Sequence, residues 1–286
     1  MIKYHTDMPA DIYHADPCES PSLSSSMAAT FITSQPCHVL LNSKRLNPAW
    51  SEESSDAKDK GQIMHDIVLM GEHRAEILDF ADWRTNAAKD ARAAAAANGK
   101  IAVLSKDWPE YEVMRGQLFK QIDCHEEHFD ALRGGDFESS LFWEESGTNF
   151  RCRFDHVNFE SGWIDDYKTT GTSISQWIRS QLFGEAKDVQ AALYERGYAA
   201  YKGTPPKGFR YIVQETYAPY CMAVVQLDTR SLQIGHQRLD WAVRQWNKCL
   251  SSGKWPGYEP KTHWASIPAY LETEWEWKLA NEEIAA

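Results

Sequence analysis

Apolar residues recur along much of the chain at the three- to four-residue spacing of amphipathic helices. This spacing predicts helices over residues 63–70, 109–129, 175–201 and 229–250. An alanine-rich stretch predicts another helix over residues 85–97, which Asn98 and Gly99 would end. Serines 24 to 26 provide a cap for a helix through residues 28–34.

Residues 137–170 follow a different pattern. Three short runs rich in aromatic and β-branched residues are separated by Ser-Gly-Thr and Glu-Ser-Gly turns, which predicts consecutive strands that form hairpins. Two more strands are predicted at residues 209–214 and 220–228. Helices, a β-meander, a helix and further strands in this order predict a mixed α/β (α+β) domain around one central sheet.

The whole chain, residues 1–286, is expected to form a single domain, because it contains no internal repeat and no long biased linker. We divide it into a lead segment (1–60), a core (61–250) and a Trp-rich tail (251–286). Residues 51–60 are polar and are expected to form an exposed loop. The tail contains four tryptophans and is expected to pack on the body: Trp255, Trp264, Trp275 and Trp277.

The formal net charge of −11 argues against a simple DNA-binding module, which would usually be basic. An enzyme acting on DNA remains compatible with this charge, since bound divalent ions reverse the local sign of a carboxylate cluster. No apolar run approaches the roughly 18 residues of a membrane helix. The polar N-terminus has no signal-peptide core, so we expect a cytoplasmic protein.

Six cysteines are scattered without a C-x-x-C pair, which argues against a zinc ribbon. We expect most of them to be buried thiols. The alternative is an iron–sulfur cluster with widely spaced ligands.

The candidate chemistry lies between residues 151 and 170. Asp155 is on one predicted strand, and Asp166 and Lys168 are on the next. Residues i and i+2 of a strand share a face, so Asp166 and Lys168 point the same way, and Asp155 joins them if the strands are neighbours. Two carboxylates can hold Mg²⁺, with Mn²⁺ as an alternative, and a bound ion activates water for phosphodiester hydrolysis. A nearby lysine can orient that water or stabilise developing charge.

Taken alone, Asp-x-Lys on a strand is usually an exposed ion pair. Here it belongs to an ordered set: Gly61-x-x-x-His65, Asp155, Asp166-x-Lys168-Thr169 and Gln190-x-x-x-Tyr194. This set resembles the PD-(D/E)XK nuclease superfamily, and within it the RecB-like branch.

Further stretches are similar to the nuclease domain of RecE-type phage and prophage exonucleases: YHADP, LSSS, WRTNAAKDARAAAAANGK, FRCRFD, DYKTT, QAALYERGY, APY and KWPGY. The resemblance implies a 5′→3′ exonuclease on double-stranded DNA ends that leaves 3′ single strands for recombination. It also implies a ring-like homo-oligomer and a single-strand annealing protein as partner.

The resemblance also implies residue roles. Asp155 and Asp166 would bind metal together with Tyr167 and His65, and Lys168 would be the catalytic lysine. His65 would ligate the metal or touch the scissile phosphate; otherwise it is an ordinary helix histidine.

Gln190 and Tyr194 lie one helical turn apart and would position the substrate strand, or pack on the sheet. Glu138 and Glu144 precede the Asp155 strand, and we favour Glu138 as the extra metal ligand over a solvated hairpin position. The doubled acid Asp165 faces away from Asp166 and needs a partner of its own.

Arg84, Lys89 and Arg92 lie near helical spacing and form either a phosphate-binding track or a solvated helix face. Trp143 and Trp177 either stack on a terminal base or belong to the core. Two further functions remain as alternatives: an endonuclease of the same superfamily, and a silent acidic partner protein that mimics DNA.

Overall fold

The computed structural model describes residues 2–50, 56–71 and 73–285, with the side chains of residues 56, 57 and 283–285 left aside. The chain divides into two compact units, Met1–Pro256 and Gly257–Ala286. The second unit contains helix α10 (Ala269–Ala285), and its Trp264, Trp275 and Trp277 side chains are exposed. Trp255 belongs to the first unit, where its ring packs on Phe31 and Trp246, as expected for the start of the tail.

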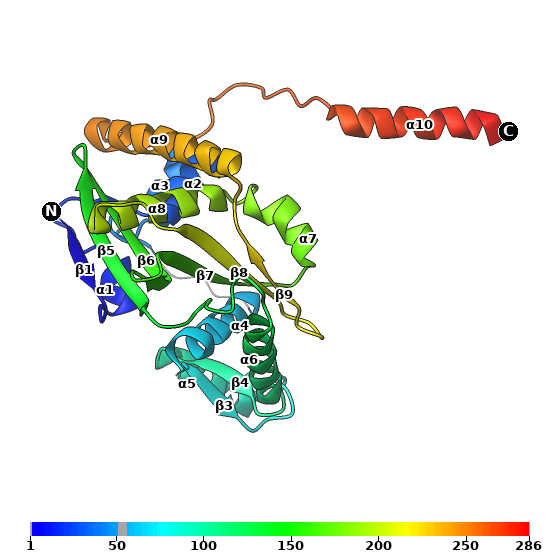
Figure 1. Ribbon diagram of the computed structural model, residues 1–286. Helices are drawn as coiled ribbons and strands as arrows, with labels where there is room; N and C mark the ends of the chain where they lie inside the picture. The colour runs from blue at the N-terminus through cyan, green and yellow to red at the C-terminus, as the bar shows by residue number, and fades with distance from the viewer. Residues whose placement is uncertain (1, 51–55, 72, 286) are drawn as a thin grey trace. The chain divides into compact units, whose positions relative to one another are not determined.

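A mixed sheet of seven strands forms the centre of the first unit (Figure 1). Six strands follow the order β1-β5-β6-β7-β8-β9, and β2 pairs with β6. Among the described strand pairs of this sheet, β7–β8 and β2–β6 are parallel and the others are antiparallel. The strands are β1 (Lys3–His5), β2 (Ser22–Leu23), β5 (Asp136–Glu145), β6 (Thr148–Asn158), β7 (Trp163–Thr170), β8 (Gly208–Glu215) and β9 (Met222–Val225).

Helices cover both faces of this sheet. On one face, α2 (Ser25–Thr33), α8 (Lys187–Lys202) and α9 (Thr229–Ser252) bury a large aromatic core that includes Trp143, Trp177 and Trp246. Four short helical segments lie elsewhere in the first unit: α1 (Ala10–His14), α3 (Pro36–Asn42), α7 (Ile174–Trp177) and the π-helix η2 (Ile178–Leu182).

On the other face, α4 (Asp56–His65), the π-helix η1 (Asp66–Met70) and α6 (Trp108–Asp123) enclose a second core. A small parallel sheet of β3 (Ala75–Leu78) and β4 (Ile101–Leu104), joined by α5 (Asn86–Ala97), extends this side (Figure 1). The predicted mixed α/β class with a central sheet flanked by helices is confirmed.

Several predicted elements are confirmed in detail. The Thr85 hydroxyl caps α5 by accepting the Ala88 N–H at 3.2 Å, and Gly99 follows its end with a φ of +69°. Ser24 caps α2 in the same way. The three strands of residues 137–170 form the predicted meander, β5 to β7.

Other boundaries were wrong. The helix predicted over 175–201 is broken between Leu182 and Lys187, where Ala186 adopts a left-handed φ of +54°. The helix predicted over 109–129 ends at Asp123, because the His125 ring nitrogen accepts the N–H groups of Glu127 and His128 and forms a turn.

Two further expectations need correction. Of the loop predicted over residues 51–60, residues 51–55 lie outside the described part, and α4 already includes residues 56–60. The strand predicted over 220–228 is only Met222–Val225, because Asp228 instead caps α9 by accepting the Ser231 N–H. Met70 and Ile234, apolar residues of the helices predicted over 63–70 and 229–250, are exposed.

Candidate active site

Strands β6 and β7 separate at the residues that carry the acids. They pair from Asn158–Trp163 to His156–Asp165, and no further pairs follow. Asp155 lies just past the last pair, where its Oδ2 accepts the Tyr167 N–H at 2.9 Å in place of a ladder carbonyl. The two strands therefore diverge at Asp155, and the Asp155 carboxylate connects them through its hydrogen bond to the Tyr167 N–H.

Asp166 and Lys168 share a face of β7, as the alternation predicts. β7 pairs with β8 along its entire length, from Trp163–Gly208 to Thr170–Glu215, which holds this segment extended. The Lys168 ammonium group forms an ion pair with Asp166 Oδ1 and lies 3.9 Å from Asp155 Oδ2. Gln190 of α8 donates to Asp166 Oδ2 at 2.6 Å. The predicted set Asp155, Asp166, Lys168 and Gln190 is thus brought together by three different elements.

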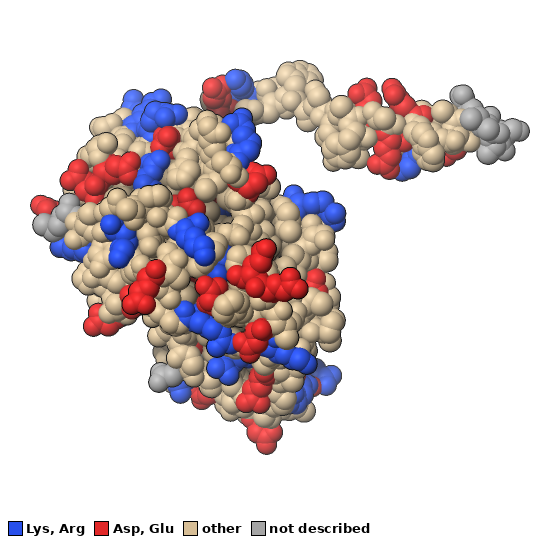
Figure 2. Space-filling model, viewed as in Figure 1, with Lys and Arg blue, Asp and Glu red and all other residues tan. Residues whose placement is uncertain are grey.

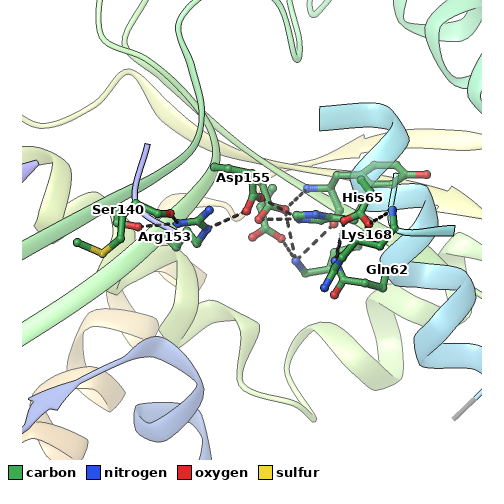
Figure 3. A network of polar contacts seen from close by, with 12 residues as sticks. Gln62, His65, Ser140, Arg153, Asp155 and Lys168 are labelled. Carbon is green, nitrogen blue, oxygen red and sulfur yellow. Dashed lines mark hydrogen bonds and ion pairs between the residues drawn. The ribbon is translucent and has the colours of Figure 1, made fainter. Parts of the chain in front are cut away.

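His65 reaches the same place from the last residue of α4 (Figure 3). Its Nε2 lies 3.1 Å from Asp155 Oδ1 and 3.5 Å from Glu138 Oε1. One ligand atom from each of His65, Glu138 and Asp155 lies within 4.8 Å of the other two. Glu138 is therefore part of the cluster, whereas Glu144 lies at the β5–β6 turn and accepts the Gly147 N–H.

Glu138 has an unusual backbone. Its φ is +49° within β5, a left-handed conformation that non-glycine residues rarely adopt and that costs free energy. Its Oε2 accepts from Arg153 Nε at 2.8 Å, while Oε1 faces His65. The strained residue is thus held with one carboxylate oxygen directed at the cluster.

The cluster has opposing effects on its acids. Burial raises the pKa of the Asp155 and Asp166 carboxyl groups. At Asp155 the charges of His65 and Lys168 outweigh burial and lower the pKa to about 2. At Asp166 burial dominates over the attraction of Lys168 and raises the pKa to about 6. Burial also raises the pKa of Glu138.

The two bases of the site respond to the acids. Burial lowers the pKa of Lys168 and His65, but the neighbouring carboxylates more than offset this effect and leave both pKa values raised. The cations and anions of the site therefore stabilise one another's charged forms.

Tyr167 and Tyr194 lie beside the cluster. The Tyr167 ring packs in the second core and its hydroxyl donates to Gln214, so its side chain faces away from the acids. Its carbonyl oxygen accepts from Lys168 Nζ at 3.4 Å, which leaves the main chain as the part that could join a metal site. The Tyr194 hydroxyl donates to the Arg153 carbonyl at 2.8 Å, so Tyr194 supports the strand that carries Asp155.

Asp165, the acid that precedes Asp166, has hydrogen-bond partners of its own, as predicted. Its buried carboxylate accepts from Arg210 Nε at 2.5 Å, from His156 Nδ1 at 2.9 Å and from the Leu132 N–H at 2.8 Å. Burial works against ionisation, but these donors lower the pKa of Asp165 overall. Asp166 is therefore the acid on the face of the site, in agreement with the Asp-x-Lys spacing.

The three predicted DNA-binding residues lie on or next to α5, apart from the strands that carry the acids. Arg84 donates to Asp82 at 2.7 Å, Lys89 is exposed, and Arg92 lies 3.9 Å from Asp59 and over the Trp83 ring. Figure 2 shows acidic and basic side chains interspersed over the visible face of this unit. Each arginine thus has an acidic neighbour.

Arg153 is the residue that sequence reasoning missed. It shares the strand face of Asp155, two residues earlier, and donates to Glu138, to Ser140 Oγ and to the Met8 carbonyl (Figure 3). The i, i+2 relation to Asp155 was the available signal. Trp143 and Trp177, at 2% and 1% exposure, belong to the core and are not available for base stacking.

The donor set suits a divalent cation. Two carboxylates and one imidazole, with Asp166 and the Tyr167 carbonyl beside them, offer mainly hard oxygen ligands of the kind that Mg²⁺ and Mn²⁺ take. The described cysteines are free thiols, and none of them belongs to a group of three or more metal-ligating side chains among the described residues. Among the described helices, none is long and apolar enough to cross a membrane.

Comparisons with known proteins bear on the family and the fold of the chain. The family model described as a PDDEXK-like domain of unknown function matches residues 24–263. The crystal structure of a putative exonuclease from Eubacterium rectale is similar, with a TM-score of 0.61 and 12% sequence identity over 94% of this chain and 99% of that chain. A likeness at this identity shows a shared fold. No curated protein matches the chain.

Proposed function

Because the chain belongs to the family of PDDEXK-like domains, we propose that it is a divalent-metal-dependent exodeoxyribonuclease that degrades double-stranded DNA from its ends. The observation that carries the proposal is the convergence of His65, Glu138 and Asp155 within 4.8 Å, next to the Lys168–Asp166 pair. Acids, a histidine and a lysine from four elements meet at the one place where β6 and β7 separate.

Each residue has a role in this proposal. His65, Glu138 and Asp155 would hold the ion, with Asp166 and the Tyr167 carbonyl as further oxygen donors. A bound Mg²⁺ or Mn²⁺ would supply an activated water and stabilise charge on the scissile phosphate.

The remaining residues act on the substrate or on the acids. Lys168 orients the attacking water and stabilises developing negative charge. Gln190 fixes the Asp166 carboxylate through its 2.6 Å hydrogen bond, and Arg153 fixes Glu138.

The finer features rest on resemblance. The RecE-like stretches support 5′→3′ polarity, a ring-like homo-oligomer and a single-strand annealing partner. The name of the similar Eubacterium rectale structure supports an exonuclease over an endonuclease.

The test is digestion of linear and covalently closed circular duplex DNA, each labelled at defined positions, with Mg²⁺, with Mn²⁺ and with a chelator. The proposal expects metal-dependent release of the 5′ label from linear DNA and an intact circle. Cutting of the circle would establish an endonuclease instead. Failure to cut either DNA in both metals would leave the acidic partner protein as the better account.

A further inference from the structure

A second lysine lies near the acids at the start of α8. Lys187 is the first residue of this helix, and its side chain is 16% exposed. Lys187 lies about one helical turn before Gln190, whose side chain donates to Asp166. The described catalytic set makes no use of Lys187.

The backbone of Lys187 is held by the strand next to the one that carries Asp166. Tyr211 is the register partner of Asp166 on the neighbouring strand β8, and its hydroxyl donates to the Lys187 carbonyl at 2.5 Å. Three residues later Gln190 donates to Asp166 at 2.6 Å. Residues three apart share a helix face, so Lys187 and Gln190 are on the side of α8 that meets the acid.

The Lys187 ammonium has a replaceable partner. It lies 2.8 Å from Glu185 Oε2, and the Glu185 side chain is 57% exposed on the short segment before α8. An ion pair with a largely exposed carboxylate contributes little. An incoming phosphate could therefore take the place of Glu185 at small cost.

We propose that Lys187 is a phosphate-binding residue of the substrate site, which binds a backbone phosphate of the DNA strand next to the one held by the metal cluster and Lys168. Glu185 occupies this position when no DNA is bound. The inference rests on the proposed nuclease function and adds a named contact to the substrate.

The chemistry follows from charge and distance. Ammonium groups bind phosphate as compact point charges, and each contact with a DNA phosphate releases counterions. Lys187 and Lys168 belong to different elements, α8 and β7, and α8 contacts Asp166 through Gln190. Cations carried by two elements that meet at one acid can contact successive phosphates.

The test is equilibrium binding of the full-length protein to a fluorescent linear duplex oligonucleotide, measured over a range of salt concentrations in the presence of a chelator. Lys187→Gln should weaken binding and reduce the slope of log K against log salt by about 0.7–0.9, the value for one phosphate contact. Lys187→Arg keeps the charge and should keep the slope. Glu185→Gln removes the competing carboxylate and should tighten binding.

The matched control is Lys202→Gln, which makes the same charge change at the last residue of α8. Fifteen residues of helix put it about 22 Å from Lys187, so this variant should bind as the wild type does. The thermal unfolding midpoints of all four variants show that none has lost the fold.

An unchanged slope for Lys187→Gln, or a loss that Lys202→Gln reproduces, would overturn the inference. Looser binding by Glu185→Gln would also contradict it. These outcomes differ from failure of the proposed function, in which the wild-type protein itself neither binds nor cuts linear DNA.

Discussion

The Lys168 side chain lies next to both Asp155 and Asp166. It pairs with Asp166 and lies 3.9 Å from Asp155, and no apolar core depends on it. Lys168→Met should reduce cleavage by at least about 10²–10³-fold while the protein stays folded, because one transition-state donor is lost. Lys168→Arg should also fail, since its planar group cannot take the position of a compact ammonium. Steady-state cleavage and circular dichroism measure the two effects, and near-normal rates in both variants would show that the lysine is misassigned.

Glu138 and Glu144 offer a matched pair on one strand. Glu138→Gln removes a charged ligand from the cluster with His65 and Asp155, whereas Glu144→Gln changes a turn residue. Titration calorimetry with Mn²⁺ should show weaker binding for Glu138→Gln and unchanged binding for Glu144→Gln. Equal affinities in the two variants would remove Glu138 from the metal site.

Asp165 gives a pH-dependent test of stability. Asp165→Asn leaves the Arg210 charge without its buried partner and should cost about 3–5 kcal/mol at neutral pH. Because the pKa of Asp165 is lowered in the folded state, its stabilisation is present above the unfolded pKa and is lost as pH falls through the folded pKa.

Urea unfolding of both proteins at several pH values should therefore show the difference shrink in acid. Asp130→Asn removes the exposed partner of the same arginine and should cost less. A constant difference at all pH values would mean that the charge of Asp165 is not what stabilises the fold.

At the residue level, the sequence predicted what local periodicity encodes. Asp166 and Lys168 share a face because strands alternate, and Gln190 and Tyr194 share one because helices turn. The strained backbone of Glu138 carries no such local signal, because a φ of +49° is imposed by the surrounding strands and side chains. Arg153 was missed because its partners come from distant segments, including the Met8 carbonyl.

At the scale of elements, helix α8 packs tightly against the sheet at Gly197. A Cβ on Gly197 would lie 2.9 Å from atoms of the buried Trp143 ring, whereas one on Gly116 of α6 would meet nothing within 4 Å. Gly197→Ala should therefore destabilise the protein by about 1–3 kcal/mol through overpacking. Gly116→Ala should stabilise it by about 0.5–1 kcal/mol, as expected in an exposed helix.

Urea unfolding of the two glycine variants measures both signs. The same α8 carries Gln190, so a shifted helix in Gly197→Ala should also slow cleavage. Equal stability of the two variants would mean that α8 can accommodate a methyl group at Gly197 beside the Trp143 ring.

The elements differ in how far they could be predicted. The β5–β7 meander and α5 could be predicted because turn residues, helix caps and local composition mark where they begin and end. The break before α8 was not, since Ala186 adopts a left-handed conformation with a residue type that usually favours helix. Helix α4 includes polar residues 56–60 because its inner face, with Ile63 and Met64, packs in the second core. These tertiary contacts could not be predicted from the local sequence.

At the scale of the whole molecule, the end of the first unit can be tested by truncation. A chain ending at Pro256 retains Trp255 against Phe31 and Trp246, and the Pro256 carbonyl that accepts the Cys37 N–H. It should unfold cooperatively, because these contacts lie within the first unit. A chain ending at Ser252 loses these contacts and should be less stable by roughly 1–2 kcal/mol, the worth of two aromatic pairs. Equal thermal unfolding of the two truncations would show that Trp255 does not anchor the unit.

The charge of the molecule is unevenly divided between its units. Residues 257–286 contain six acidic residues against two lysines, so the unit that carries the site is less acidic than the total of −11 suggests. A basic composition is not required under the proposed function, in which bound cations would offset the carboxylates of the site.

The pairing of β7 has a consequence for the synthesis of the chain. β7 shares three residue pairs with β6 but eight with β8, which ends at Glu215. His65 leaves the ribosome first and Asp166 follows, yet β8, which pairs with β7 along its whole length, emerges some forty residues later. Under the proposed function, a nascent chain that ends before β8 would carry the candidate catalytic residues without their arrangement, so it would not cleave DNA until translation has passed Glu215.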